Sequence, residues 1–123
     1  MTTMDIAKKL VALCREGKQD EAKSTMYAED AVSVEAAMPP GMEREANGIA
    51  AILAKGKWWR DNHDIHSVEI NGPWPHDDRF IVNFEYDVTH KPSGQRMQMS
   101  DVGLYTVRNG KIVREEFFYD MGA

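Results

Sequence analysis

The chain of 123 residues contains one cysteine, Cys14, which excludes an intramolecular disulfide and a cysteine-based zinc site. Cys14 falls among apolar helix positions, so a buried structural thiol is favoured over a nucleophile. No apolar run approaches the length of a membrane span, and Asp5 stands where a signal peptide would carry positive charge. We therefore expect a cytoplasmic protein that does not cross a membrane.

Positive charge is also scarce, with 15 Lys and Arg against 20 Asp and Glu and a formal net charge of −5. A partner with a phosphate backbone needs clustered basic residues. Lys55 and Lys57 are too isolated to form a basic stripe, and we interpret them as part of a solvated helix face. No nucleic-acid partner is expected.

Sequence motifs for cofactors are missing as well. The chain has no Gly-rich phosphate loop, no dinucleotide fingerprint and no nucleophile-elbow serine, so phosphoryl transfer, nicotinamide chemistry and serine hydrolysis are poorly supported. His63 and His66 are three residues apart, but a helix should be ending there and no carboxylate completes a ligand set. We expect neither a cofactor nor a metal.

The clearest positive signal is a β-hairpin near the C-terminus. Asn109-Gly110 separates two β-rich runs, expected over residues 96–108 and 111–119. Asn and Gly both tolerate the positive φ of a type I′ turn, which makes this pair the strongest short-range hairpin signal.

The first half of the chain instead has helical periodicity. Thr2 and Asp5 form a capping box for a helix that Gly17 ends, and a second helix is expected over residues 19–27. Asn47 is the expected N-cap of a third helix. Gly56 lies on the apolar stripe of that helix and costs about 1 kcal/mol of propensity, for which we expect close approach to a sheet to compensate.

Strands are expected over residues 31–35, 65–72 and 79–90, in addition to the C-terminal hairpin. In residues 79–90 the apolar side chains alternate, as in a half-buried antiparallel strand: Phe80, Val82, Phe84, Tyr86 and Val88. Helices followed by an antiparallel meander indicate a single α+β domain over residues 1–123.

Three segments carry a family resemblance: residues 27–35 (YAEDAVSVE), residues 47–52 (NGIAAI) and residues 101–119, which include the hairpin. In these the chain resembles the nuclear transport factor 2-like superfamily, specifically its SnoaL-like and ketosteroid isomerase-like bacterial members. The resemblance spans nearly the whole chain and implies a cone-shaped barrel, with helices packed on a strongly bent antiparallel sheet and a pocket at the open end. Because the superfamily includes isomerases, cyclases, dehydratases and hydrolases, the resemblance specifies a fold better than a function.

The resemblance also implies site residues. Glu35 occupies the position of the catalytic base, and Asp101 matches the protonated carboxyl that hydrogen-bonds the developing oxyanion. Leu10 stands where the family has a tyrosine, which counts against steroid isomerisation.

The residues themselves leave alternatives open. Asp101 shares strand parity with Met97, Met99 and Tyr105, so an inward side chain with a raised pKa is favoured, although an outward salt bridge is the alternative. Glu35 is either a general base beside an apolar pocket or a solvated residue at a strand end. His66, in phase with Val68, is either an acid/base group or a hydrogen-bonded core histidine.

Large apolar and polarizable side chains are available to line an adaptable pocket. The candidates are Met38, Trp58, Trp59, Met97, Met99, Tyr105, Phe117 and Tyr119. A Pro-Pro-Gly loop with Met38 and Met42 on its inner side is a candidate lid.

The leading hypothesis is a protein that binds a small apolar or carbonyl-bearing metabolite. If it is catalytic, the expected reaction is cofactor-free proton transfer, namely isomerisation, dehydration or cyclisation, with Glu35 as base, Asp101 at the enolate oxygen and His66 as a weaker substitute. The alternatives are a non-catalytic ligand-binding or sensing module and an interaction domain. A homodimer through the outer sheet face is expected in each case.

Overall fold

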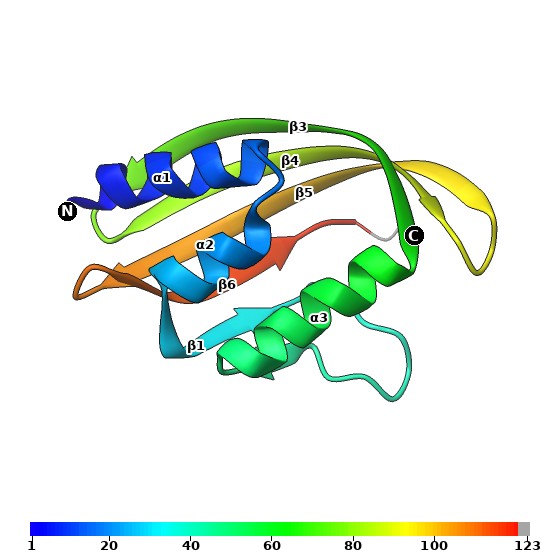
Figure 1. Cartoon of the computed structure of the whole chain (residues 1–123), viewed down its shortest axis with the longest axis horizontal. Helices are drawn as coiled ribbons and strands as arrows, with labels where there is room; N and C mark the ends of the chain where they lie inside the picture. The colour runs from blue at the N-terminus through cyan, green and yellow to red at the C-terminus, as the bar shows by residue number, and fades with distance from the viewer. Residues whose placement is uncertain (121–123) are drawn as a thin grey trace.

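The computed structural model describes residues 1–120, which form three helices and one six-stranded sheet (Figure 1). The elements in chain order are α1 (Thr3–Arg15), α2 (Gln19–Met26), β1 (Tyr27–Val34), β2 (Glu45–Asn47), α3 (Ile49–Asp61), β3 (His63–His76), β4 (Arg79–His90), β5 (Gln95–Arg108) and β6 (Lys111–Phe118). This is the α+β class expected from the sequence. Within the described part of the chain, no helix combines the length and apolar character needed to span a membrane.

The helix ends follow local chemistry. The capping box at Thr2 and Asp5 is confirmed, because each residue's side chain accepts a hydrogen bond from the other's backbone N–H. Gly17 follows the end of α1 with φ of 74°, as expected for a helix stop. The prediction for the third helix was wrong by one residue: its N-cap is Gly48, because Asn47 is still part of β2.

The strand order is β2-β1-β6-β5-β4-β3, and β3 to β6 form the expected antiparallel meander. The expectation of a purely antiparallel sheet was wrong, however, because β1 pairs with β6 in parallel. A short strand, β2, pairs with β1 in antiparallel orientation at the edge of the sheet. The β1–β6 pair joins Ser33 to Glu115, which no local sequence pattern can reveal. The cone shape implied by the resemblance stays a prediction.

The type I′ hairpin is confirmed. Asn109 and Gly110 have φ of 52° and 76°, and they connect the paired residues Arg108 and Lys111.

The core lies between the helices and one face of the sheet. α1 packs on β3 and β4, and α3 packs on β1 (Figure 1). The expected inner face of β4 is confirmed, with Phe80, Val82 and Val88 fully buried. Cys14 is buried in this core, and burial raises the pKa of its thiol to about 11, so it is a protonated packing group.

Candidate functional site

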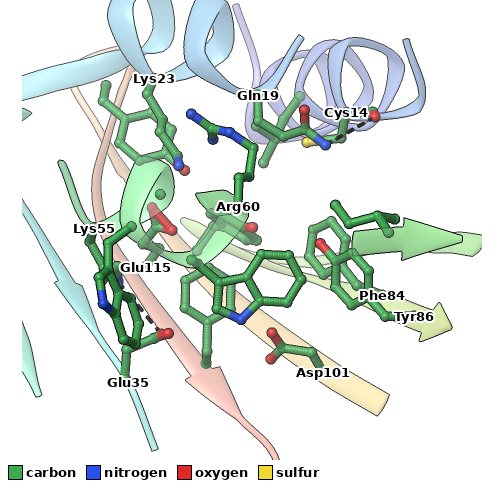
Figure 2. Close-up of a pocket in the computed structure, with 18 residues that line it drawn as sticks. Cys14, Gln19, Lys23, Glu35, Lys55, Arg60, Phe84, Tyr86, Asp101 and Glu115 are labelled. Carbon is green, nitrogen blue, oxygen red and sulfur yellow. Dashed lines mark hydrogen bonds and ion pairs between the residues drawn. The ribbon is translucent and has the colours of Figure 1, made fainter. Parts of the chain in front are cut away.

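A cavity of about 180 Å³ lies between the helices and the inner face of the sheet (Figure 2). All three helices contribute to its wall, together with side chains from β1, β3, β4, β5 and β6 and with Glu35, which follows β1. Its aromatic side chains come from opposite sides: Trp59 of α3 lies 5.3 Å from Tyr86 of β4 between ring centroids. The cavity is therefore a partly open space whose walls combine apolar and charged side chains, suited to a small molecule.

The structure brings together six of the predicted site residues on this wall: Glu35, Trp58, Trp59, Asp101, Tyr105 and Phe117. The other predicted residues are not among those that line it: Met38, His66, Met97, Met99 and Tyr119.

His66 lies outside the cavity because β3 contains a bulge. The register with β4 shifts between Ile65 and Ser67, so Ile65 lines the cavity and His66 is exposed. Its Nε2 lies 2.7 Å from the hydroxyl of Thr89, on the neighbouring strand. The strict alternation assumed from the sequence is wrong at this point, and the bulge is the reason.

Met97 and Met99 are half-buried on β5, beyond Asp101 and toward the β4–β5 turn. Tyr119 follows β6, where its hydroxyl donates a hydrogen bond to the carbonyl of Ala37 at 2.9 Å. This hydrogen bond holds the start of the loop that contains Met38 against the end of β6.

Glu35 forms an ion pair with Lys55 of α3, with 3.5 Å between Oε2 and Nζ. Lys55 also donates a hydrogen bond to the hydroxyl of Ser33 and lies 5.4 Å from the ring centre of Phe117. Only 13% of the Lys55 side chain is exposed, so its prediction as part of a solvated face was wrong. Lys55 is three residues from the fully buried Ile52 and shares its helix face, which turns the lysine toward β1.

Asp101 lies on the inner face of β5, the orientation favoured from the sequence. Its Oδ1 is buried without a hydrogen-bond partner. Burial, reinforced by the charges of Glu35 and Glu115 and only partly offset by Lys55, raises the pKa of Asp101 to about 7. Asp101 is therefore a carboxyl group that exchanges its proton near neutral pH.

Glu35 has a different environment. Burial raises its pKa, and the charge of the neighbouring Lys55 ammonium opposes this shift by favouring the ionised form. The same cavity thus contains one carboxyl stabilised as the anion by a contacting ammonium group and one without such a contact, a division typical of paired acid and base groups.

Glu115 of β6 is a site residue that the sequence analysis missed. It is only 2% exposed, and its Oε1 has no hydrogen-bond partner. Burial raises its pKa, while Lys23, Lys55 and hydrogen bonding with Tyr27 oppose this shift. A signal was present, because Glu115 has the same strand parity as Phe117, which was predicted to face the pocket.

Lys23 of α2 is the second missed residue, and it explains Gly56 of α3. A Cβ built on Gly56 would lie 2.7 Å from Nζ of Lys23 and 3.3 Å from a guanidinium nitrogen of Arg60. The close approach expected at Gly56 is therefore to these side chains, whereas the predicted contact with a sheet was wrong. The missing Cβ leaves room for the Lys23 ammonium at the cavity wall.

Three buried side-chain oxygens lack a hydrogen-bond partner in residues 1–120, and they belong to Glu35, Asp101 and Glu115. All three residues line this cavity. Buried polar atoms are rarely left unpaired in a folded protein, so these oxygens mark positions where a ligand or water can bind. No group of three or more His, Cys, Asp or Glu in the described residues has an arrangement that could hold a metal ion.

Comparison with solved structures gives relatives at two levels of similarity. A protein from Mesorhizobium loti, described as a putative SnoaL-like polyketide cyclase, is 39% identical over 97% of this chain and all of its own, with a TM-score of 0.91. A putative isomerase from Bacillus subtilis (21% identity, 96% of this chain and 86% of its own, TM-score 0.72) shares the fold.

A protein of ketosteroid isomerase-like fold from Catenulispora acidiphila, crystallised with trimethylamine, is 14% identical over 94% of this chain and 85% of its own, with a TM-score of 0.71. No curated protein matches the chain at a significant level. The model of the SnoaL-like domain matches residues 1–119. The chain therefore belongs to the SnoaL-like family.

Proposed function

We propose that this protein binds a compact carbonyl compound in the cavity and transfers a proton beside the carbonyl group without a cofactor. The observation that carries this proposal is the pair of unequal carboxyl groups, Glu35 with its Lys55 partner and Asp101 with its unpaired Oδ1. Two carboxyls whose pKa values are set apart by their surroundings can act as base and acid in one reaction.

In this mechanism the ionised Glu35 removes a proton from the carbon next to the carbonyl. The electron pair moves toward the carbonyl oxygen, and protonated Asp101 donates a hydrogen bond to the enolate that forms. Return of the proton from Glu35 to a different carbon completes an isomerisation. In a dehydration, the enolate expels a hydroxyl group, which takes the proton from Glu35 and leaves as water. In a cyclisation, the enolate carbon attacks a second carbonyl, whose oxygen takes the proton from Glu35 and becomes a hydroxyl group.

The cavity volume limits the substrate. A dry protein cavity of roughly 150 Å³ is known to hold benzene, so the 180 Å³ here suits a ligand of on the order of ten non-hydrogen atoms. The named chemistry of two relatives, a putative cyclase and a putative isomerase, is of the type proposed. The cavity size favours a smaller substrate than a fused-ring polyketide or a steroid.

The proposal is tested by the exchange of α-protons in a small ketone. Cyclohexanone is incubated with the protein in D₂O, and loss of the α-proton signal is followed by NMR. We expect the protein to accelerate exchange and Glu35→Gln to reduce that acceleration by about 10²-fold or more. Glu116→Gln, one residue beyond Glu115 and not part of the cavity wall, is the matched control.

Equal exchange rates for the wild type and Glu35→Gln would contradict the proposed base. Ketone binding without any acceleration would support the alternative of a ligand-binding module.

We also propose that two copies associate through the outer face of the sheet, as the family resemblance implies. Trp74 pairs with Ile81 across β3 and β4, and the two side chains are 55% and 37% exposed. Ile81 in turn pairs with Leu104 of β5, so an apolar row crosses three strands on the face opposite to the core. Exposed apolar rows of this kind favour association of like subunits.

A further inference from the structure

The end of the cavity formed by Lys23 and Glu115 has unsatisfied hydrogen-bonding groups of opposite kinds. Lys23 forms no hydrogen bond or ion pair with any described residue, and Oε1 of Glu115 is buried without a hydrogen-bond partner. Figure 2 shows Lys23 extending from α2 toward Glu115, while Asp101 lies at the opposite end of the view. An ammonium group can only donate hydrogen bonds, and a carboxylate can only accept them.

The other two cations of the cavity wall are already engaged. Lys55 contacts Ser33 and Glu35, and both terminal nitrogens of Arg60 donate hydrogen bonds to the carboxylate of Asp20. Among the described residues that line the cavity, Lys23 is thus the cation whose N–H groups are available to donate hydrogen bonds to a ligand. The ammonium of Lys23 fits against the backbone of α3 because Gly56 has no Cβ.

The two ends of the site are separated along the sheet. Glu115 pairs with Tyr105 of β5, four residues beyond Asp101, which corresponds to about 13 Å of strand. A ligand whose carbonyl oxygen contacts Asp101 therefore brings a different part of its structure to Glu115, not the same functional group.

The charges around this end select among possible ligand groups. An anionic group would lie in the field of Glu35 and Glu115, and a cationic group would lie in the field of Lys23 and Lys55. A neutral hydroxyl group avoids both repulsions, since it accepts a hydrogen bond from the ammonium and donates one to the carboxylate.

We propose that Lys23 and Glu115 together bind a neutral hydroxyl group of the substrate, which makes the substrate a compact hydroxycarbonyl compound. This inference rests on the proposed function for its carbonyl end and adds a second recognition site at the other end. Lys23 and Glu115 determine specificity here, while the proton transfer belongs to Glu35 and Asp101.

Four ring ketones of similar size test the inference: cyclohexanones that carry at carbon 4 a hydroxyl, a methyl, a carboxylate or an ammonium group. Binding to the full-length protein is measured by NMR, with ¹³C shifts of the Glu115 and Asp101 carboxyls reporting on the two ends separately. We expect 4-hydroxycyclohexanone to bind about tenfold more tightly than 4-methylcyclohexanone, because only the hydroxyl satisfies both polar groups.

The variant Lys23→Met removes the donor while keeping most of the side-chain length. We expect it to bring the hydroxyl-to-methyl preference close to one. Lys57→Met is the matched control, because Lys57 lies on the exposed side of α3 and pairs with Asp61. Circular dichroism of both variants establishes that they are folded.

Tighter binding of the carboxylate or the ammonium compound, equal binding of the hydroxyl and methyl compounds, or no binding of any ketone would each overturn the inference. If the ¹³C signal of Asp101 shifts on ketone binding but that of Glu115 shows no shift that depends on the hydroxyl group, the inference is rejected and the proposed function stands. A hydroxyl-dependent shift at Glu115 with no response at Asp101 rejects the proposed carbonyl position instead.

Discussion

The ammonium of Lys23 occupies the space that a side chain at Gly56 would fill, since a Cβ there would lie 2.7 Å from Nζ. The contact joins α2 to α3 at the cavity wall. The absence of a side chain at Gly56 therefore affects the pKa of Glu115 on β6, because Lys23 is the charge that most strongly opposes the rise of that pKa.

Gly56→Ala should move Lys23 away while leaving the fold intact, because the displaced atoms are the far ends of flexible side chains. Helix propensity favours alanine by about 1 kcal/mol, so we expect unchanged or slightly higher stability in thermal denaturation. We also expect the pKa of Glu115 to rise in a ¹³C NMR titration. Lys23→Met should shift the pKa of Glu115 in the same direction. If the pKa of Glu115 in Gly56→Ala equalled that of the wild type, the proposed packing would be contradicted.

Asp101 should make the protein less stable as the pH rises. Its pKa is about 7 in the folded state, against 3.8 for an ordinary aspartate, so the folded state binds the proton more tightly than the unfolded chain does. This contribution is fully present below about pH 4 and is lost as the pH rises to about 7. Asp101→Asn should therefore flatten the dependence of the unfolding free energy on pH over this range, measured by urea denaturation.

Asp87→Asn is the control for that experiment. Asp87 lies on β4, and hydrogen bonding with Arg96 lowers its pKa, so its effect on the pH dependence has the opposite sign. An Asp101→Asn variant whose stability curve is as steep as that of the wild type would show that Asp101 is not the responsible group.

Lys55→Met should destabilise the protein at neutral pH, because it leaves Glu35 partly buried beside an apolar side chain. Both partners of the pair are less than one-fifth exposed, and we expect a loss of about 1–3 kcal/mol. The loss should shrink when the pH is lowered and Glu35 becomes protonated. A double-mutant cycle with Glu35→Gln isolates the pair, and additive effects would show that the two side chains do not interact.

Tyr119→Phe should loosen the loop that begins at Glu35. The phenol donates a hydrogen bond to the carbonyl of Ala37, and its loss should cost about 1 kcal/mol. We expect faster amide hydrogen exchange in residues 36–42 and unchanged exchange in β4. Wild-type exchange rates throughout that loop would mean that this contact does not restrain it.

The proposed dimer predicts that a charge in the apolar row will separate the subunits. Ile81→Lys should convert a dimer into a monomer in sedimentation velocity at micromolar concentration, because the charge would be buried at the interface. Met42→Lys is the control, since Met42 is also exposed but lies in the loop after β1. A wild-type protein that sediments as a monomer would refute the association.

Local sequence signals predicted the parts of this protein that local interactions determine. The capping box at Thr2, the turn at Asn109 and the alternating face of β4 follow from the chemistry of a few neighbouring residues. Asp101 was placed on the inner face by the same alternation.

The missed residues depend on contacts that are distant in the chain. Lys55 and Glu115 are charged, and sequence analysis interprets such residues as solvated unless a partner is known. The groups that act on them come from other elements. Lys55 pairs with Glu35, which follows β1, and the charge that most strongly opposes the raised pKa of Glu115 is that of Lys23 in α2. The bulge in β3 similarly depends on pairing with β4, and it displaced His66 from the expected face.

The parallel pairing of β1 with β6 has a consequence for how the protein folds. Ser33 and Glu115 are partners separated by 82 positions (115 − 33), so the loop that joins them can close only at a high entropic cost. During synthesis, a chain that has not yet reached Lys111 already contains every helix of the described fold but has no partner for this edge of β1. We therefore expect both polar ends of the cavity to come together only when the last strand docks, with the binding site among the last features of the native state to form.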